Sequence, residues 1–563
     1  MNTLSVNLTH DASLTLMRDG DIILHQVEER IAHKKFAQDL YYSFDKLEEY
    51  FDSIDRLVYA GIWNGFNDWR NVTRYLEYKG YPIESNDYSM IDGGQDHHLL
   101  HAMCGYFSSP FSQDAAILVI DGAGSDLTIN SKENESIFTY DKGRVECVYK
   151  TVVGFHGIED PLTEYKPRIG VGMMYNAITE YIGFGCEQEG KTMGLSAYGT
   201  NTSNLNDFMS IETGANAELF LLVTSSRIGI TGINSPIGCK FNVGPAFKLM
   251  PKLDFNPDDQ NTIGTPTFNL RAKIAGKAQQ DFEEYVYHMI LKTIDLTGKK
   301  NIVLSGGCFM NCVSNYKLIK RLPKDVNLYV DPLCGDVGIS LGGALYSVLK
   351  DKKIPRRYSP SYLGSPLNYD YSLKEGQTEE DTTPQKIADL LSSGNIVAIA
   401  QGRAESGKRA LGNRSILFDP SVKNGREIVN RVKKRENWRP FAGTVMLEHA
   451  REWFDMDKLE ESPHMTYAID VWDEKKELIP SITHVNGTCR IQTVSEKQNK
   501  NYYDLISEFY KITGTPIVLN TSFNLAGDTI VETMQDALKT LENSEIEYLY
   551  LPDIMKLIHV PNK

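Results

Sequence analysis

The sequence predicts a mixed α/β protein that is divided into two domains. Short apolar runs that end in an aspartate or glycine turn alternate along the chain with helical stretches, which is typical of α/β folds. A Pro-, Ser- and Tyr-rich segment without periodicity, residues 351–372, interrupts this alternation. With 563 residues, of which 41% are hydrophobic and 24% charged, the chain has ample sequence for two to four globular cores.

The first strands are predicted close to the N-terminus. The runs LSVNLTH and ASLTLMRDGDIILHQV show β-type alternation around Asp19 and Gly20, and an Asp-Gly pair between two such runs predicts a β-hairpin. A helical stretch at about residues 39–53 and the strand-like run DRLVYAGI follow.

Later segments repeat this unit. The apolar strand AAILVI runs into Asp121 and Gly122 and then into a second hairpin. The strand NIVLS leads through a glycine turn into a helix that ends near Arg321, and VNLYV leads through another glycine turn into a further helix. This recurrence predicts a duplicated α/β architecture.

The domain division follows from the segments between these units. Residues from about 200 to 280 include several Pro and Gly residues and predict an insertion or a long-loop subdomain. Beyond the segment 351–372, TTPQKIADLLSSG predicts a helix that stops at Gly394, and NIVAIAQG predicts the next strand. We therefore predict a first domain at residues 1–355 and a second, of α/β or α+β type, at residues 356–563.

Composition limits the classes of function. The net charge of −15 argues against a chain that coats nucleic acid nonspecifically, although a local basic groove is compatible with it. The sequence contains no apolar run of about 18 residues, so we predict no transmembrane helix. The N-terminus lacks the pattern of a secretory signal. We expect a cytoplasmic protein without a membrane partner. The eight scattered cysteines fit a reducing compartment, and for Cys308 and Cys312 a buried structural role is favoured over a zinc site.

Three histidines, His97, His98 and His101, lie within five positions of a predicted helix. His97 and His101 share one face because they are four residues apart, whereas His98 lies about 100° round the helix from His97. Asp121 and Asp336, which each follow an apolar strand, are candidates to complete a ligand set for Fe(II), Mn(II) or Zn(II). The local spacing alone is equally compatible with histidines that serve as core or capping residues.

The second predicted domain concentrates cations among glycines. Arginine matches phosphate oxygens with two parallel hydrogen bonds, and glycine turns let backbone amides approach an anion. Four segments carry these features and favour an anion site for a triphosphate over a solvated basic face: GRAESGKRALGNRS, NRVKKRENWRPFAG, HVNGTCRIQTV and IVLNTSFNLAGD. The chain lacks a P-loop motif.

Nine motifs in order resemble one family over essentially the whole chain. They are THDAS, VEER, DHHLLHA, EGKTMGLSAYG, CGDVGISLGGAL, GRAESGKRALGNRS, KRENWRPFAG, GTCRIQTV and LNTSFN. The family is that of the O-carbamoyltransferases of nodulation-factor and antibiotic pathways, the NodU, CmcH and tobramycin type. Two positions depart from the family pattern, because Lys408 and Asn486 stand where the family often has proline and aspartate.

The resemblance implies both a fold and a reaction. It implies an N-terminal domain of the actin-like, hexokinase-like (ASKHA) fold, similar to the tRNA threonylcarbamoyl transferase, and a C-terminal YrdC-like domain. The C-terminal domain would make carbamoyladenylate from carbamoyl phosphate and ATP with Mg, releasing phosphate and pyrophosphate. The N-terminal domain would transfer the carbamoyl group to a hydroxyl acceptor and release AMP.

The resemblance also implies roles for individual residues. The metal ligands would be His97, His101, Asp121 and Asp336, with Fe(II) or another divalent metal, and His10 would accept the proton of the acceptor hydroxyl or else cap a turn. The residues that hold carbamoyl phosphate and nucleotide would be Lys433, Arg439, Arg409, Arg490, Asn520 and Ser522. Those that cradle the adenylate, or serve turn geometry, would be Glu189, Gly190, Lys191, Gly306, Gly307 and Asn311.

Three alternatives are weighed against this reading. A tRNA threonylcarbamoyl enzyme has relatives of both halves, but the motifs fit the O-carbamoyl group better. A hydrogenase maturation factor should carry paired C-x-x-C motifs, and the chain has none. A non-enzymatic nucleotide-binding scaffold should lack some of the site residues. The acceptor stays open between a sugar or antibiotic and a hydroxymethylated pyrimidine, as a nucleotide or in DNA, and a homodimer is among the assemblies we consider.

Overall fold

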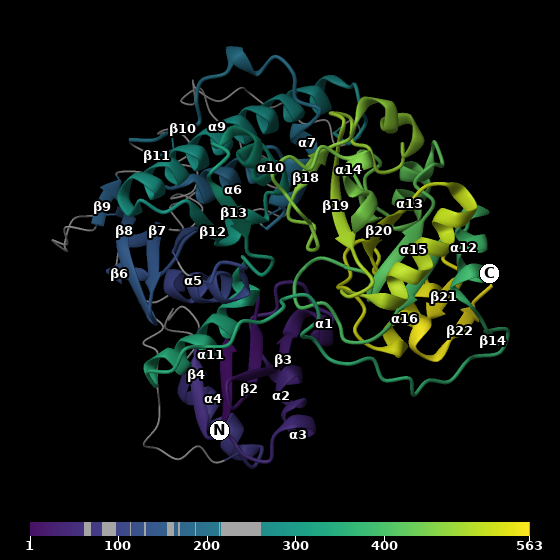
Figure 1. Ribbon diagram of the computed structural model, residues 1–563, viewed down its shortest axis with the longest axis horizontal. Coiled ribbons are helices and arrows are strands. Elements are labelled where there is room, and N and C mark those ends of the chain that lie inside the picture. Colours follow the sequence, from purple (N-terminus) through teal and green to yellow (C-terminus); the bar gives the residue numbers. More distant parts are fainter. Residues whose placement is uncertain are drawn as a thin grey trace, which may run out of the picture. The chain divides into compact units, whose positions relative to one another are not determined.

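The computed structural model describes residues 1–60, 69–81, 97–112, 114–128, 131–154, 163–166, 169–185, 187–212, 214–215 and 260–561 (Figure 1). The chain forms two compact units. The first unit comprises Met1–Val58, Trp69–Ser89 and Tyr358–Lys563, and the second comprises Tyr59–Asp68 and Met90–Arg357. The predicted division at residues 355 and 356 lies beside the boundary at Arg357. Residues 1–58, however, belong to the same unit as the C-terminal segment, and the predicted domains stay a prediction.

A four-stranded sheet in the order β3-β2-β1-β4 opens the first unit. Its strands are β1 (Asn2–Asn7), β2 (Ser13–Arg18), β3 (Asp21–Val27) and β4 (Arg56–Tyr59). The predicted hairpin is confirmed, since β2 and β3 are antiparallel and Asp19 and Gly20 both have positive φ angles, 51° and 86°. The short helices of this segment are α1 (Glu28–Ala32), α2 (Tyr41–Phe44), α3 (Leu47–Tyr50) and α4 (Trp69–Tyr78).

The second unit has a seven-stranded sheet among its described residues, with the path β13-β12-β5-β7-β8-β9 and β6 paired to β7. Its strands are β5 (Ala115–Ile120), β6 (Asp126–Thr128), β7 (Ser131–Asp141), β8 (Arg144–Gly154), β9 (Thr163–Lys166), β12 (Asn301–Ser305) and β13 (Asn327–Val330). A small hairpin pairs β10 (Met209–Ser210) with β11 (Gly214–Ala215). β5 is buried along its whole length, which explains its unbroken apolar sequence.

The four-stranded sheet of the first unit repeats part of the strand order of the seven-stranded sheet of the second unit. In the first unit β1, β2 and β3 are joined antiparallel, and β4 lies on the free side of β1. In the second unit β5, β7 and β8 are joined antiparallel, and β12 lies parallel on the free side of β5. This repetition matches the recurrent strand–turn units of the sequence, and the predicted mixed α/β class is confirmed.

Long helices cover the sheet of the second unit. α5 (His97–Ser108) packs against α11 (Ile339–Lys350), β5 and β12, and α9 (Pro266–Thr297) packs against β5. The others are α6 (Val171–Tyr181), α7 (Glu189–Ser196) and α10 (Cys312–Arg321), with 3-10 turns at η1 (Thr202–Asn204), η2 (Gly307–Met310) and η3 (Asp336–Gly338). α9 begins inside the stretch predicted to be irregular, because Thr265 caps it and Pro266 fits its first turn. The remainder of that stretch lies largely outside the described residues.

A nine-stranded sheet forms the body of the C-terminal segment in the first unit, in the order β14-β22-β21-β15-β16-β20-β17-β19-β18. Its strands are β14 (Thr378–Asp381), β15 (Val397–Ala400), β16 (Arg414–Phe418), β17 (Ala442–Met446), β18 (Ala468–Asp470), β19 (Thr488–Val494), β20 (Ile517–Ser522), β21 (Tyr548–Leu551) and β22 (Lys556–His559). The predicted strand is β15. Its alternate residues enter two different apolar clusters, so both of its faces are buried.

Helices flank this sheet on both faces. The predicted helix before Gly394 is confirmed as α12 (Pro384–Ser392), which packs against α15 (Lys500–Thr513) in one apolar cluster. α16 (Met534–Glu542) belongs to the other cluster. The remaining elements are α13 (Gly425–Val432), α14 (Ala450–Trp453), η4 (Leu447–His449), η5 (Asp473–Leu478) and η6 (Pro552–Ile554). None of the described helices is long and apolar enough to cross a membrane.

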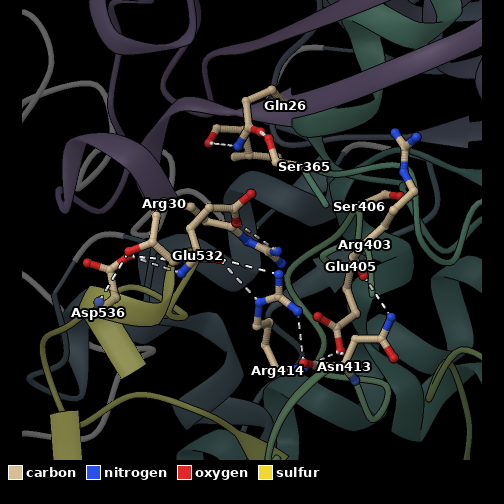
Figure 2. A network of polar contacts seen from close by, with 12 residues as sticks. Gln26, Arg30, Ser365, Arg403, Glu405, Ser406, Asn413, Arg414, Glu532 and Asp536 are labelled. Carbon is tan, nitrogen blue, oxygen red and sulfur yellow. Dashed lines mark hydrogen bonds and ion pairs between the residues drawn. The ribbon is translucent and has the colours of Figure 1, made fainter. Parts of the chain in front are cut away.

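A buried polar network joins the N-terminal and C-terminal segments of the first unit (Figure 2). Arg30 of α1 donates from Nη2 to the Gly407 carbonyl at 2.6 Å and faces Glu532 at 3.7 Å. Arg403 donates to the carbonyls of Ile23 and Leu363, both at 2.7 Å. The VEER and GRAESGK motifs therefore meet at an internal contact of this unit.

We predict that Gly342→Ala weakens the packing of α5 on α11. A Cβ atom at Gly342 would lie 2.0 Å from the Leu100 carbonyl oxygen of α5, and backbone cannot yield as a side-chain end does. The free energy of local opening at α5, measured by amide hydrogen exchange, should fall by about 1–3 kcal/mol. Gly190→Ala is the matched control, because a Cβ atom there meets nothing within 4 Å. Equal effects of the two changes would contradict this account.

Candidate active site

Four side chains of the second unit form a group that could hold a metal ion: His97, His101, Asp121 and Asp336. The histidines lie four residues apart on α5, and Asp121 directly follows the buried strand β5. Asp336 begins the turn η3, which leads into α11. Because α5 packs against both β5 and α11, one helix face meets carboxylates from two separate segments.

The donor atoms of this group converge. His97 Nε2 lies 3.1 Å from Asp121 Oδ2 and 3.6 Å from Asp336 Oδ1, and His101 Nε2 lies 3.7 Å and 3.5 Å from the same atoms. The two Nε2 atoms are 3.2 Å apart. One donor atom from each residue lies within 4.8 Å of all the others. Two imidazoles and two carboxylates in this geometry suit a borderline divalent metal.

Electrostatics in the group favour a positive charge at its centre. Burial lowers the pKa of His101, but hydrogen bonds to Asp121 and Asp336 outweigh burial and raise the pKa to about 10. Burial raises the pKa of Asp121, but hydrogen bonds from the two histidines outweigh it and hold the pKa well below its ordinary value. A proton or a divalent cation can supply the charge that the carboxylates attract.

Glycine turns orient Asp121. The Gly307 amide donates to Asp121 Oδ1 at 3.1 Å, which leaves Oδ2 directed at the histidines. Gly306 has a φ angle of 95°, and a Cβ atom there would lie 2.3 Å from the Ile120 carbonyl oxygen. Only glycine fits such a position without strain. The structure therefore gives Gly306 and Gly307 a role in placing a metal-group carboxylate.

Two neighbours of the group face other partners. His98 Nδ1 lies 2.8 Å from Ser136 Oγ, and burial lowers the pKa of His98 to about 4. Burial and then the charge of Asp121 raise the pKa of the Cys308 thiol well above its ordinary value, so Cys308 stays a neutral thiol. Cys312 is buried and contacts Met193. Cys312 is therefore buried, as its predicted structural role requires, and Cys308 is half-buried.

The other predicted adenylate residues of the second unit are partly engaged by protein. Glu189 accepts a hydrogen bond from Asn176 at 2.6 Å. Asn311 caps α10 through the Ser314 amide and exchanges two hydrogen bonds with Gln279 of α9. Lys191 lies over the Phe184 ring, and Gly190 faces open space. A structural role for Asn311 is therefore established, whereas the roles in nucleotide binding stay predictions.

A buried basic cluster lies in the first unit. Lys433, at the end of α13, donates from Nζ to the Ser522 carbonyl and to the Asn524 carbonyl and side-chain oxygens. Burial, followed by the charges of Arg435 and Arg439, lowers the pKa of Lys433 well below its ordinary value. Four contacts hold this ammonium group in place, and every nearby charge that shifts its pKa is positive.

The arginines of the cluster are less fully paired. Arg439 makes an ion pair with Glu436 at 3.6 Å, and burial lowers its pKa. Arg435 donates to Asn430 and to the Pro440 carbonyl and stacks on a neighbouring phenyl ring. Arg490 Nε is buried without a hydrogen-bond partner among the described residues. Half-buried like charges with an unused donor favour the binding of an anion.

Asn520 and Arg490 share one row of the nine-stranded sheet. Ala442 of β17 lies opposite Asn520 of β20 on one side and opposite Arg490 of β19 on the other. Asn520 Nδ2 donates to the Ala410 carbonyl at 3.3 Å, whereas its Oδ1 is buried without a partner among the described residues. The loop that carries Arg409 therefore contacts the residue row that carries the unused polar atoms.

Other cations of the basic segments have structural duties. Arg414 is fully buried and donates to the carbonyls of Gln401, Asn413 and Glu532 (Figure 2). Arg431 is exposed and pairs with Glu545. The four segments thus divide into a buried cluster around Lys433, carbonyl-bound arginines and solvent-exposed side chains. Neither an anion site nor a solvated basic face describes all of them.

Sequence reasoning counted Arg435 among the cations of the second domain but gave no role to two side chains that border the cluster, Thr444 and Gln492. Thr444 Oγ1 donates to Gln492 Oε1 at 2.9 Å, and both bond to Asn520 Nδ2. The period of two on a strand gives a signal for Gln492, since it shares a face of β19 with Arg490. His10 lies half-buried in the loop between β1 and β2 of the first unit.

The fold and these two groups of side chains define an α/β protein with a group that could hold a metal ion and a separate basic cluster. The chain matches the families described as Carbamoyltransferase N-terminus, over residues 93–345, and Carbamoyltransferase C-terminus, over residues 388–557. Nodulation protein NolO of Bradyrhizobium diazoefficiens is 30% identical over 81% of this chain and 77% of its own length. The chain therefore belongs to the carbamoyltransferase family, and it is an enzyme that transfers carbamoyl groups.

Two further relatives show the range of similarity. Nodulation protein NolNO of Sinorhizobium fredii is 29% identical over 96% of this chain and 78% of its own length. The 3'-hydroxymethylcephem-O-carbamoyltransferase of Streptomyces clavuligerus is 32% identical over 45% of this chain and 48% of its own. A solved structure of full-length HypF in the phosphate- and nucleotide-bound form covers 62% of this chain and 55% of its own, at 14% identity and a TM-score of 0.31, values too low to define the fold.

We predict that the purified protein binds one divalent metal ion per chain and that His101→Ala weakens this binding by at least about tenfold, since even residues that only support a ligand are worth about 10- to 100-fold. Metal content after dialysis against limiting Fe(II), Mn(II) or Zn(II) measures the loss. His288→Ala is the control, because His288 is exposed on α9 of the same unit. Equal metal content in both variants would exclude His101 as a ligand.

Proposed function

We propose that the chain is an ATP-dependent O-carbamoyltransferase that works in two steps. The first step makes carbamoyladenylate from carbamoyl phosphate and ATP at the buried basic cluster. The second step transfers the carbamoyl group to a hydroxyl acceptor and releases AMP. One observation carries the proposal most directly, namely that the charges of Lys433, Arg439 and Arg490 lie near one another while Arg490 Nε and Asn520 Oδ1 are buried without partners among the described residues.

The basic cluster suits the first step because both substrates are polyanions. Arg439, Arg490 and Arg409 can pair with phosphate oxygens, while Lys433 and Ser522, which both bond to Asn524, stay predicted contacts of carbamoyl phosphate. Asn520 Oδ1 accepts hydrogen bonds, so it matches the amide protons of a carbamoyl group rather than a phosphate oxygen. Asn520 Oδ1, a neutral hydrogen-bond acceptor among the cations, thus distinguishes carbamoyl phosphate from a simple phosphate ester.

The bonds of the first step balance as follows. Water attacks the carbamoyl carbon of carbamoyl phosphate, phosphate leaves, and carbamate remains. A carbamate oxygen then attacks the α-phosphorus of ATP, and pyrophosphate leaves with Mg. The charges that develop on the departing phosphates are offset by the surrounding arginines, of which Arg435 is held by hydrogen bonds to Asn430 and the Pro440 carbonyl.

For the second step we assign the group of His97, His101, Asp121 and Asp336. These four residues would hold a divalent metal such as Fe(II), which would supply a Lewis acid for the carbamoyl oxygen. Gly307 fixes Asp121, and the packing of α5 fixes both histidines before any substrate arrives. In this step the acceptor oxygen attacks the carbamoyl carbon and AMP departs, and His10 of the first unit is retained as the predicted acceptor of the hydroxyl proton.

The acceptor is a hydroxyl compound of low molecular weight or a hydroxymethylated pyrimidine. The name of the Streptomyces clavuligerus relative specifies a hydroxymethyl group as the carbamoylated function, and a primary alcohol of this kind occurs on both acceptor types. The proposal retains the ASKHA and YrdC-like assignments and the homodimer as predictions. It also retains the residues Glu189, Gly190 and Lys191 as candidate contacts of the adenylate.

The proposal is tested with carbon-labelled carbamoyl phosphate, ATP and a panel of alcohols that includes aminoglycosides, a hydroxymethyl cephem and 5-hydroxymethylpyrimidine nucleosides and nucleotides. Labelled product, AMP and pyrophosphate should appear in equal amounts with the right acceptor. Absence of AMP and pyrophosphate with every acceptor would refute the adenylate route.

We predict that Arg439→Ala lowers pyrophosphate release from carbamoyl phosphate and ATP by about 100-fold or more, the usual cost of removing a donor from a charge-stabilising site. Arg431→Ala provides the control. Arg431 lies eight positions earlier in the same segment, is 65% exposed, and pairs only with a surface glutamate. Normal pyrophosphate release by Arg439→Ala would remove Arg439 from the anion site.

We also predict that the two steps separate in His101→Ala. Carbamoyl transfer should be lost because the metal group is incomplete, whereas pyrophosphate release at the basic cluster should continue. Both are followed in one reaction with labelled carbamoyl phosphate. If His101→Ala and Arg439→Ala lost pyrophosphate release equally, a single site would have to perform both steps.

A further inference from the structure

The loop that carries His10 is held from several sides. Asn7 Nδ2 donates to the Asp11 carbonyl at 3.1 Å, and Asn7 Oδ1 accepts from the Thr9 amide at 3.0 Å. The Ala12 amide donates to the Ala37 carbonyl at 2.9 Å. These contacts come from neighbouring parts of the N-terminal segment and close the loop at both ends.

A contact from far along the chain completes this set. Lys408 Nζ donates to Asp11 Oδ2 at 2.7 Å, and the same ammonium lies 5.1 Å from the centre of the Phe36 ring. The preceding residue is anchored independently, because Arg30 donates to the Gly407 carbonyl at 2.6 Å. Lys408 therefore extends from a fixed backbone to the residue next to His10.

The two side chains of the ion pair between Lys408 and Asp11 differ in their exposure to solvent. The Asp11 side chain is 3% exposed, and its Oδ1 is buried without a hydrogen-bond partner among the described residues. The Lys408 side chain is 25% exposed and can turn its ammonium toward water. Loss of Lys408 would leave a buried carboxylate without its cation, whereas loss of the Asp11 charge would leave a lysine that can be solvated.

The loop of Lys408 also contacts Asn520, which lies beside the basic cluster. Arg409 follows Lys408 directly, and the Ala410 carbonyl accepts a hydrogen bond from Asn520. Three successive residues thus connect the His10 loop with the residues assigned to carbamoyl phosphate.

We propose that Lys408 is a positioning residue that fixes the His10 loop through its ion pair with Asp11 and so ties the proton acceptor of the transfer step to the loop of Arg409. This inference rests on the proposed function, since it assigns His10 and Arg409 to successive steps. The device is particular to chains with lysine at this position.

Four variants test the proposal: Lys408→Met, Lys408→Arg, Asp11→Asn and the double variant Asp11→Asn/Lys408→Met. Hydrogen exchange at residues 8–12, read by mass spectrometry on the full chain, reports the order of the His10 loop. In Lys408→Met this exchange should accelerate by at least about tenfold, because a buried carboxylate has lost its partner. The turn at Asp19 and Gly20, in the same sheet, is the internal control and should not change.

The other variants separate positioning from general stability. Lys408→Arg should restore slow exchange, since arginine keeps the cation. Asp11→Asn should perturb the loop less than Lys408→Met, and the double variant should be less perturbed than Lys408→Met alone, because the uncompensated charge is gone. Unchanged exchange in Lys408→Met, or a double variant worse than both single variants, would overturn the proposal.

Activity supplies a second readout. A purely structural role of Lys408 would change pyrophosphate release and carbamoyl transfer together, whereas a positioning role would change only the transfer. Lys408→Met should keep pyrophosphate release within about twofold of the parent and lose carbamoyl transfer to the alcohol panel by at least about tenfold, the effect expected when a reacting group is displaced. Equal loss of both activities would contradict the assignment. The exchange measurement needs no acceptor, so it decides the role of Lys408 even if the proposed reaction itself is not observed.

Discussion

Compensation of buried charge organises the first unit. Arg30, Arg403 and Arg414 lie in the interior contact between its N-terminal and C-terminal segments, and main-chain carbonyls accept most of their hydrogen bonds. Glu405 Oε1 accepts from the backbone amides of Leu411, Asn413 and Arg414 in the neighbouring loop. Buried guanidinium and carboxylate groups are costly unless paired in this way, so the two segments cannot drift apart without exposing unsatisfied partners to each other.

The same constraint separates structural charges from those available for chemistry. Main-chain carbonyls accept most of the hydrogen bonds of Arg414 itself. Around Lys433 the neighbours are cations, and Arg490 Nε and Asn520 Oδ1 lack partners among the described residues. In the second unit the imbalance has the opposite sign, because two carboxylates face two imidazoles. The two groups thus differ in the sign of their net charge, and the proposed two-step transfer assigns the phosphates to the basic cluster and the metal to the acidic group.

Local patterns were sufficient to predict much of this structure. The Asp19-Gly20 turn, the helix before Gly394 and the fully apolar strand β5 follow from turn chemistry and hydrophobic periodicity, which act over a few residues. The spacing of His97 and His101 placed them on one face. Asp121 and Asp336 were identified as candidates because carboxylates after apolar strands collect at one edge of a sheet.

The remaining features depend on contacts that no local pattern records. The sequence grouped Arg403, Arg409 and Arg414 together, yet only tertiary packing decides that Arg403 and Arg414 serve backbone carbonyls. Residues 1–58 belong to the unit of the C-terminal segment through bonds such as Arg30 to Gly407 and Gln26 to Ser365, which join distant residues. Nothing in VEER identifies Gly407 as its partner, since a main-chain carbonyl carries no sequence signal.

The pairing of Arg30 with Gly407 also has a consequence for biosynthesis. Their separation is 377 residues, and a ribosome that adds about 5–20 residues per second needs roughly 20–75 s to cover it. During that interval the guanidinium of Arg30 and the backbone of β3 lack their final partners, although the strands around them are already complete. The speed of translation through the middle of the message, and the binding of chaperones during it, should therefore influence the yield of folded protein.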